Sequence, residues 1–204
     1  FEVGLSWQRG DTFGVSGQTE GVHNYQVSGV DAAGNESGQS PTLPVTLDLS
    51  APAVPVAPDL QPGSDSGISN SDDITNVSSP TFDVSPAEMF FRFYRSGALV
   101  SSTFETGGTF TAAGEPEGNW NYTVSSVDVA GNESAASGAL GVMLDFTAPA
   151  APAAPDLLPG SDAMDETNNA TDNRTTDPTP EFGVTTPADH FFRLYRDGTL
   201  VSVP

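Results

Sequence analysis

The sequence predicts an all-β protein made of repeated antiparallel β-sandwiches, and two local patterns carry that prediction. Apolar and polar residues alternate over short runs such as Phe90–Tyr94, while the periodicity of helices is missing. Turn signals that contain glycine, such as Ser96-Gly97 and Gly131-Asn132, separate these runs about every ten residues. Short strands at this spacing, over a period of 97 residues, are typical of a seven-stranded sandwich.

The period is fixed by two pairs of nearly identical segments. Residues 51–65 return as residues 148–162, and residues 25–37 return as residues 122–134, both displaced by 97 positions. A period of this length is the size of a whole small domain and too long for a solenoid repeat. We therefore predict one complete and two partial copies: the C-terminal half of a domain at 1–50, a complete domain at 51–147 and the N-terminal half of a domain at 148–204.

Each strand of the complete copy is assigned from an apolar run bounded by turns. In chain order we expect strands A to G near 54–60 (A), 80–85 (B), 89–95 (C), 98–104 (C′ or D), 109–113 (E), 120–128 (F) and 138–146 (G). Tyr25 and Tyr122 follow the pattern Glu-Gly-x-x-Asn at the start of strand F, which suits the tyrosine corner of such sandwiches. The assignment therefore gives this tyrosine a structural role.

The two partial copies are complementary halves of one domain. Neither half contains enough strands to bury its apolar face, and each would present open strand edges. Two explanations remain open: the chain is an excerpt of a longer polypeptide, or the halves pair between neighbouring molecules.

Composition excludes several classes of function. The chain has 27 acidic and 6 basic residues and a net charge of -21, which repels nucleic acids and anionic membrane surfaces but attracts divalent cations. It has no cysteine, so a metal site would use oxygen ligands. No apolar run is long enough to span a membrane, so we expect no direct membrane insertion. No nucleophile motif or phosphate loop is present, and we expect no catalysis.

Several motifs together resemble bacterial immunoglobulin-like (Ig-like) repeats of large surface adhesins and biofilm proteins. They are Ala-Pro-x-x-Pro, Pro-Asp-Leu with the Ser- and Asp-rich stretch after it, Pro-Thr-Phe at 80–82, and Asp-x-Ala-Gly-Asn-Glu-Ser. The resemblance implies tandem Ig-like sandwiches at the bacterial cell surface, acting as an extracellular extender that calcium stiffens between domains. The third copy replaces Ser-Gly-Ile-Ser with Ala-Met-Asp-Glu, so its loop departs from this pattern.

Acidic and amide side chains gather in two places where oxygen ligands could bind calcium. The first is the A–B loop and the end of strand G, with Asp59, Asp65, Asp72, Asp73 and Asp145, and in the third copy Asp156, Asp162, Asp165, Glu166 and Asp172. The second is the F–G turn with Asp128, Asn132 and Glu133, which Asp48 of the preceding copy would meet across the linker. The alternative is that these residues only form turns, as Asp and Asn often do.

Three functions compete at this point. The first is a spacer whose partners are neighbouring Ig-like repeats of the same chain. The second is a subunit of an extracellular filament or biofilm matrix, in which half-domains of adjacent chains complete each other. The third is a ligand-binding module beside a secreted polysaccharide-degrading enzyme, with a sugar-binding patch of Arg92, Arg95, tyrosine and Trp120. We expect instead that the arginines lie on the outward face of strand C and pair with acidic neighbours. The sequence names no receptor or surface ligand.

Overall fold

The computed structural model describes residues 10, 12–86, 88, 90–162, 171–185 and 191–201. These residues form strands, turns and loops, together with one short helix, α1 (Pro159–Asp162). The chain divides into two compact units, residues 1–146 and 147–204. The first unit contains a partial and a complete copy of the repeat, and the second contains a partial copy.

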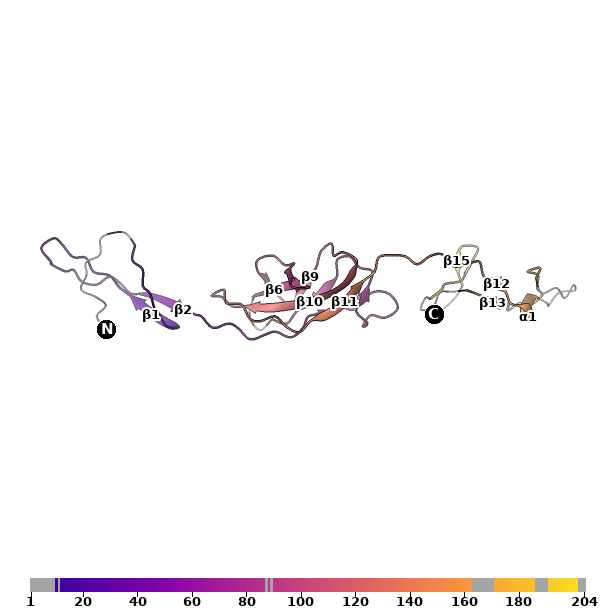
Figure 1. Ribbon diagram of the computed structural model, residues 1–204, viewed down its shortest axis with the longest axis horizontal. Coiled ribbons are helices and arrows are strands. Elements are labelled where there is room, and N and C mark those ends of the chain that lie inside the picture. Colours follow the sequence, from indigo (N-terminus) through magenta and orange to yellow (C-terminus); the bar gives the residue numbers. More distant parts are fainter. Residues whose placement is uncertain are drawn as a thin grey trace. The chain divides into compact units, whose positions relative to one another are not determined.

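The complete copy has two sheets (Figure 1). The smaller sheet has the order β3-β5-β9, with β3 (Asp59–Leu60), β5 (Thr81–Asp83) and β9 (Thr109–Thr111). The strands of the larger sheet are β4 (Ile74–Thr75), β6 (Phe90–Arg95), β7 (Ala98–Leu99), β8 (Glu105–Thr106), β10 (Gly118–Val127) and β11 (Leu140–Leu144). Their order in the sheet is β4-β11-β10-β6-β7, and β8 also pairs with β6. The prediction of an Ig-like antiparallel sandwich is confirmed.

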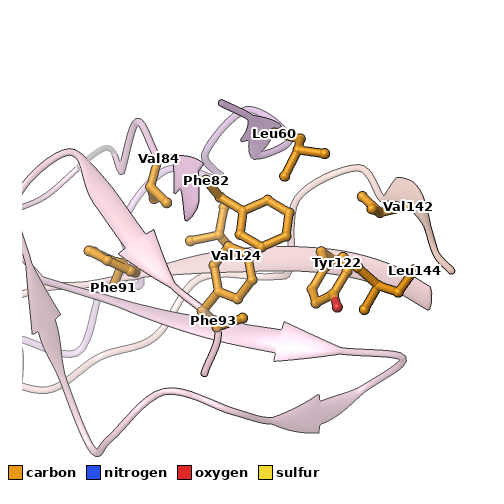
Figure 2. Close-up of a cluster of buried hydrophobic side chains, with 10 residues drawn as sticks. Leu60, Phe82, Val84, Phe91, Phe93, Tyr122, Val124, Val142 and Leu144 are labelled. Atoms are coloured by element: carbon orange, nitrogen blue, oxygen red, sulfur yellow. The ribbon is translucent and has the colours of Figure 1, made fainter. Parts of the chain in front are cut away.

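The core lies between the two sheets and is mainly aromatic. Alternation along β6 and β10 turns Phe93 and Tyr122 inwards, where they meet Phe82 of β5. The ring of Phe82 lies 5.0 Å from that of Phe93 and 4.7 Å from that of Tyr122, centroid to centroid (Figure 2). These separations are typical of favourable aromatic pairs, so the core holds one sheet against the other.

The observed strands differ from the predicted ones where pairing with strands distant in the sequence determines their bounds. Strand A is only two residues long, because Pro55 and Pro58 have no backbone N–H for a ladder. The segment predicted as one A–B loop contains β4, which pairs in parallel with β11. Of the strand predicted at 98–104 only the start, β7, is a strand; β8 follows after residue 104, and both pair with β6.

The first partial copy repeats the end of the complete one. Strand β1 (Gly21–Tyr25) pairs with β2 (Leu43–Leu47), so that Gly21 faces Leu47 as Gly118 faces Leu144 in the β10–β11 pair. Within the described part of the chain, these two strands form a sheet only with each other. The local hairpin therefore forms in the same register with or without the rest of the sandwich.

The second unit repeats the start of the complete copy. Strand β12 (Asp156–Leu157) pairs with β13 (Phe182–Gly183) as β3 pairs with β5. Strand β14 (Tyr195–Arg196) pairs with β15 (Thr199–Leu200) as β6 pairs with β7.

The tyrosine predicted at the start of strand F is fully buried in the complete copy. The Tyr122 hydroxyl donates to Glu115 Oε2 at 2.9 Å, so its partner is a side chain and not the backbone. Burial and this contact with a carboxylate raise the pKa of Tyr122 well above its ordinary value. The corresponding Tyr25 donates to Gln18 Oε1 at 3.2 Å.

Candidate functional site

The Asp-x-Ala-Gly-Asn segment is a turn closed by its own aspartate. Asp128 Oδ1 accepts the backbone N–H groups of Ala130 and Asn132 at 2.9 and 2.8 Å, and its Oδ2 accepts the Asn132 side-chain amide at 2.9 Å. Gly131 has a φ of 92°, which is unfavourable for other residues and explains the glycine here. The Asn132 hydrogen bonds hold the pKa of Asp128 below its ordinary value.

The same turn contacts the end of the preceding copy. Asn132 Nδ2 donates to the backbone carbonyl of Asp48 at 3.1 Å. The Asp48 carboxylate instead accepts the N–H of Ser50 at 3.1 Å, and the Ser50 hydroxyl contacts both Glu20 carboxylate oxygens at 2.9 and 2.8 Å. The structure thus brings together the three residues expected to meet across the linker, Asp48, Asp128 and Asn132. The contact between the copies is made by the Asp48 backbone carbonyl and the Asn132 side-chain amide.

Glu133, the next residue of the motif, has a structural role that the sequence did not reveal. Its carboxylate accepts hydrogen bonds from Arg92 Nη1 and the Tyr94 hydroxyl, both at 2.5 Å, and from Ser125 Oγ at 2.6 Å. Burial opposes its ionisation, but the bonds from Ser125 and Tyr94 and the charge of Arg92 outweigh this and lower the pKa of Glu133. The motif is thereby tied to strand β6, which supplies Arg92 and Tyr94.

The loop between β3 and β4 contains a buried carboxylate that is only half satisfied. Asp65 is 3% exposed; its Oδ2 accepts the N–H of Asp73 at 3.2 Å, whereas its buried Oδ1 has no hydrogen-bond partner. Burial, and then the charges of Asp65, Asp59 and Asp72, raise the pKa of Asp73. A buried carboxylate oxygen among other acids is costly unless a donor or cation reaches it.

The backbone around Asp65 is fixed by hydroxyl groups. Thr75 Oγ1 donates to the Ser64 carbonyl at 2.5 Å, and Ser64 Oγ accepts the N–H of Thr81 at 2.9 Å. The buried position of Asp65 is therefore set by this network, which joins the loop to β4 and β5.

The described residues on either side of the corresponding loop in the third copy make contacts like those of the complete copy. Asp162 is buried and accepts the N–H of Arg174 at 3.0 Å, while Asp172 accepts the same N–H at 3.3 Å. Ser161 Oγ accepts the N–H of Glu181 at 3.0 Å, as Ser64 does from Thr81. Asp165 and Glu166 lie outside the described residues.

The remaining predicted ligands are at the surface. Asp59, Asp72, Asp145 and Asp156 are exposed, and Asp72 Oδ1 accepts the N–H of Ile74 at 3.3 Å. The backbone N–H of Asp145 donates to the Thr75 carbonyl at 2.9 Å, which places Asp145 beside β4. Across the described ranges, no three Asp, Glu or His side chains form a group that could hold a metal ion.

The strand-C arginines have acidic partners, as expected. Arg95 Nη1 lies 2.7 Å from Glu115 Oε2, and its guanidinium lies 4.7 Å from the centre of the Trp120 ring. Trp120 Nε1 donates to the Pro116 carbonyl at 2.8 Å. The residues proposed for a sugar-binding patch are thus engaged with their own domain.

Comparison with known proteins shows what the complete copy is similar to. Residues 51–146 match the family described as bacterial Ig-like domain. The search of curated proteins found no match. None of the helices in the described part of the chain has the length and apolar character to cross a membrane. Together with its two-sheet fold, the match shows that the complete copy, residues 51–146, is similar to a bacterial Ig-like domain.

Proposed function

We propose that this chain is a non-catalytic extracellular spacer of a bacterial surface adhesin, in which tandem Ig-like domains provide reach. The observation that carries the proposal is the hydrogen bond from Asn132 to the Asp48 carbonyl, which ties the F–G turn of one copy to the end of the preceding copy. The family is a non-catalytic one, and the net charge of -21 disfavours binding to nucleic acids or anionic lipids. A short, proline-rich linker adds stiffness between copies.

We further propose that calcium stabilises the loops and the junction. The best-supported position is the loop between β3 and β4, because Asp65 Oδ1 is a buried carboxylate oxygen without a donor. A hard cation would satisfy it. Asp73, Asp59 and Asp72 would be the other carboxylates only after they move closer to Asp65, because in the described residues these side chains do not form a group that could hold a metal ion. Hydroxyl groups, carbonyls and water would have to complete the coordination, because calcium takes about six to eight oxygen ligands.

Calcium at the remaining positions has weaker support. At the junction, hydrogen bonds of the turn already use both carboxylate oxygens of Asp128, so a cation there would use their remaining lone pairs and Asp48. In the third copy the buried Asp162 supports an equivalent loop site, which Asp156 and Asp172 would complete. Asp145 would join the site of the complete copy from the end of β11.

Thermal unfolding of the chain in chelator and in millimolar calcium tests the metal proposal. Saturation at about one hundred times the dissociation constant would add about 2.7 kcal/mol, which should raise the melting temperature by about 10 °C or more for a domain of this size. Asp65→Asn should abolish most of this rise. Asp197→Asn is the matched control, since it removes the same charge from an exposed turn whose φ of 50° asparagine tolerates. Identical melting curves with and without calcium would contradict the proposal that calcium binds this chain.

Small-angle X-ray scattering tests the spacer itself. The spacer proposal predicts that the maximum dimension of the chain is larger in calcium than in chelator, because fixed junctions reduce bending. Asn132→Ala should lower the maximum dimension in both conditions, because it removes the direct contact to Asp48. A maximum dimension that responds to neither change would contradict a stiffened junction.

A further inference from the structure

The Asp-x-Ala-Gly-Asn turn of the complete copy has its shape fixed by local hydrogen bonds. Asp128 closes the turn with bonds to the N–H groups of residues 130 and 132, and Asp31 closes the turn of the first copy in the same way. Side-chain bonds of this kind set the conformation of a turn. They do not set where the tip of the turn lies relative to the sandwich.

Ser134 attaches the chain after the turn to strand β10. Its backbone N–H donates to the Ser126 carbonyl at 2.9 Å, and its Oγ accepts the Ser126 N–H at 3.0 Å. Ser37 makes the same two bonds with Gly29 in the first copy, both at 2.8 Å. These bonds are therefore local as well, and they hold the turn to the strand that leads into it.

Glu133 attaches the turn to a second strand, β6. Arg92 Nη1 donates to its Oε2, and the Tyr94 hydroxyl donates to its Oε1. The side chains of Arg92 and Glu133 are 27% and 28% exposed, so solvent screens this ion pair only in part. Arg92 is itself held in place, because its Nε donates to the Thr103 carbonyl at 3.1 Å and its guanidinium lies 5.1 Å from the centre of the Phe104 ring.

Asn132, which directly precedes Glu133, makes the contact with the preceding copy. Its Nδ2 donates to the Asp48 carbonyl at 3.1 Å and to Asp128 Oδ2 at 2.9 Å. A hydrogen bond weakens steeply when its donor is displaced or turned away. The contact with Asp48 therefore tolerates little movement of the turn, and the residue next to Asn132 is the one fixed to β6.

We propose that Glu133 is a positioning residue of the junction: held by Arg92 and Tyr94, it places the F–G turn so that Asn132 reaches the preceding copy. Substitutions on the face of β6 then loosen the contact between copies through Glu133. The inference rests on the junction of the proposed spacer and deepens it by naming what positions the contact. It requires no calcium.

Nuclear magnetic resonance of the full chain in chelator tests this role. The measured signal is the nuclear Overhauser effect between the Asn132 side-chain amide protons and the protons of residues 48–50. Tyr94→Phe removes one hydroxyl donor to Glu133 and keeps the ring, and it should reduce this signal by about half or more. Tyr195→Phe is the matched control, since it removes the hydroxyl of the corresponding exposed tyrosine in the third copy and should leave the signal unchanged.

The charge pair is tested by conservative and non-conservative variants. Glu133→Gln should reduce the signal, whereas Glu36→Gln, the same change in the first copy, should not. Arg92→Lys keeps a positively charged donor and should retain the signal, whereas Arg92→Met should lose it. All variants are compared at a temperature at which the methyl signals of Val124 and Val142 in the core match those of the wild type. A loss of the contact under this condition arises from the turn and not from unfolding.

Two outcomes distinguish this inference from the proposed function. A wild-type signal that persists in Tyr94→Phe, Glu133→Gln and Arg92→Met would overturn the positioning role and leave the junction in place. Absence of the signal in the wild type would overturn the contact with Asp48 itself, and with it both the positioning role and the observation that carries the spacer proposal.

Discussion

The complete copy and the first partial copy contain nearly the same C-terminal strands, yet these strands differ in what they bury. The hairpins β10–β11 and β1–β2 have the same register and the same Asp-x-Ala-Gly-Asn turn. Tyr122, Val124 and Val142 are nevertheless buried in a core, whereas Val27 and Val45 are exposed. The comparison shows that pairing and turn geometry are local properties of this sequence, while the core requires both halves of the repeat.

The largest difference between copies is expected in the free energy of unfolding lost when a core phenylalanine is replaced. Phe82→Ala should lower the free energy of unfolding of the complete copy by about 3–5 kcal/mol, because it leaves a cavity beside Phe93 and Tyr122. Phe182→Ala, the same change at an exposed position, should alter the unfolding curve by less than about 0.5 kcal/mol. Urea denaturation of both variants measures the difference. Similar losses would mean that the second unit has a core of its own.

A smaller difference in stability is expected when the glutamate of the Asp-x-Ala-Gly-Asn-Glu-Ser motif is replaced. Glu133→Gln should destabilise the complete copy by about 1–2 kcal/mol, because it removes the charge that Arg92, Tyr94 and Ser125 contact. Glu36→Gln, the matched change in the first copy, should leave the unfolding of the complete copy unchanged.

The same pair of variants reveals the pH dependence of this cluster. The folded-state pKa of Glu133 lies below the ordinary 4.5, so its stabilising contribution is complete above pH 4.5 and is lost as the pH falls through the folded-state pKa. Stability measured from pH 6 downwards should therefore fall less steeply for Glu133→Gln than for the wild type. Equal slopes would place the acid sensitivity elsewhere.

The smallest difference is expected at the turn, where the two copies agree. Asp128→Ala and Asp31→Ala each remove a carboxylate that accepts backbone N–H groups two and four residues later. Amide exchange at Asn132 and at Asn35 should accelerate by similar factors, because the turn is closed by local bonds. A much larger effect in the complete copy would show that its turn depends on the surrounding sandwich.

The sequence predicted the fold because its signals were local. Alternation located β6, β10 and β11, and the internal repeat revealed which segments are equivalent. Strand β4 could not be foreseen, since two residues in a parallel pair with β11 have no pattern of their own. Strand A is shorter than its apolar residues predict, because Pro55 and Pro58 cannot donate to a ladder.

For the proposed calcium loop, the sequence indicates the acidic residues but not their burial. The acidic residues were visible as a cluster, but burial distinguishes Asp65 from Asp59 and Asp72, and burial depends on the Ser64, Thr75 and Thr81 network. The role of Glu133 depends on Arg92, which is 41 residues away in the sequence. The repeat alone offered a signal for it: Glu36 and Glu133 recur together with Ser28 and Ser125.

The most direct test of the account is amide hydrogen exchange of the full chain. The account predicts that amides at residues 123–127, which pair with β6, exchange at least ~100-fold more slowly than those at 26–30, which lack that partner. Equal protection of the two segments would contradict the claim that, among the described residues, the core lies in the complete copy.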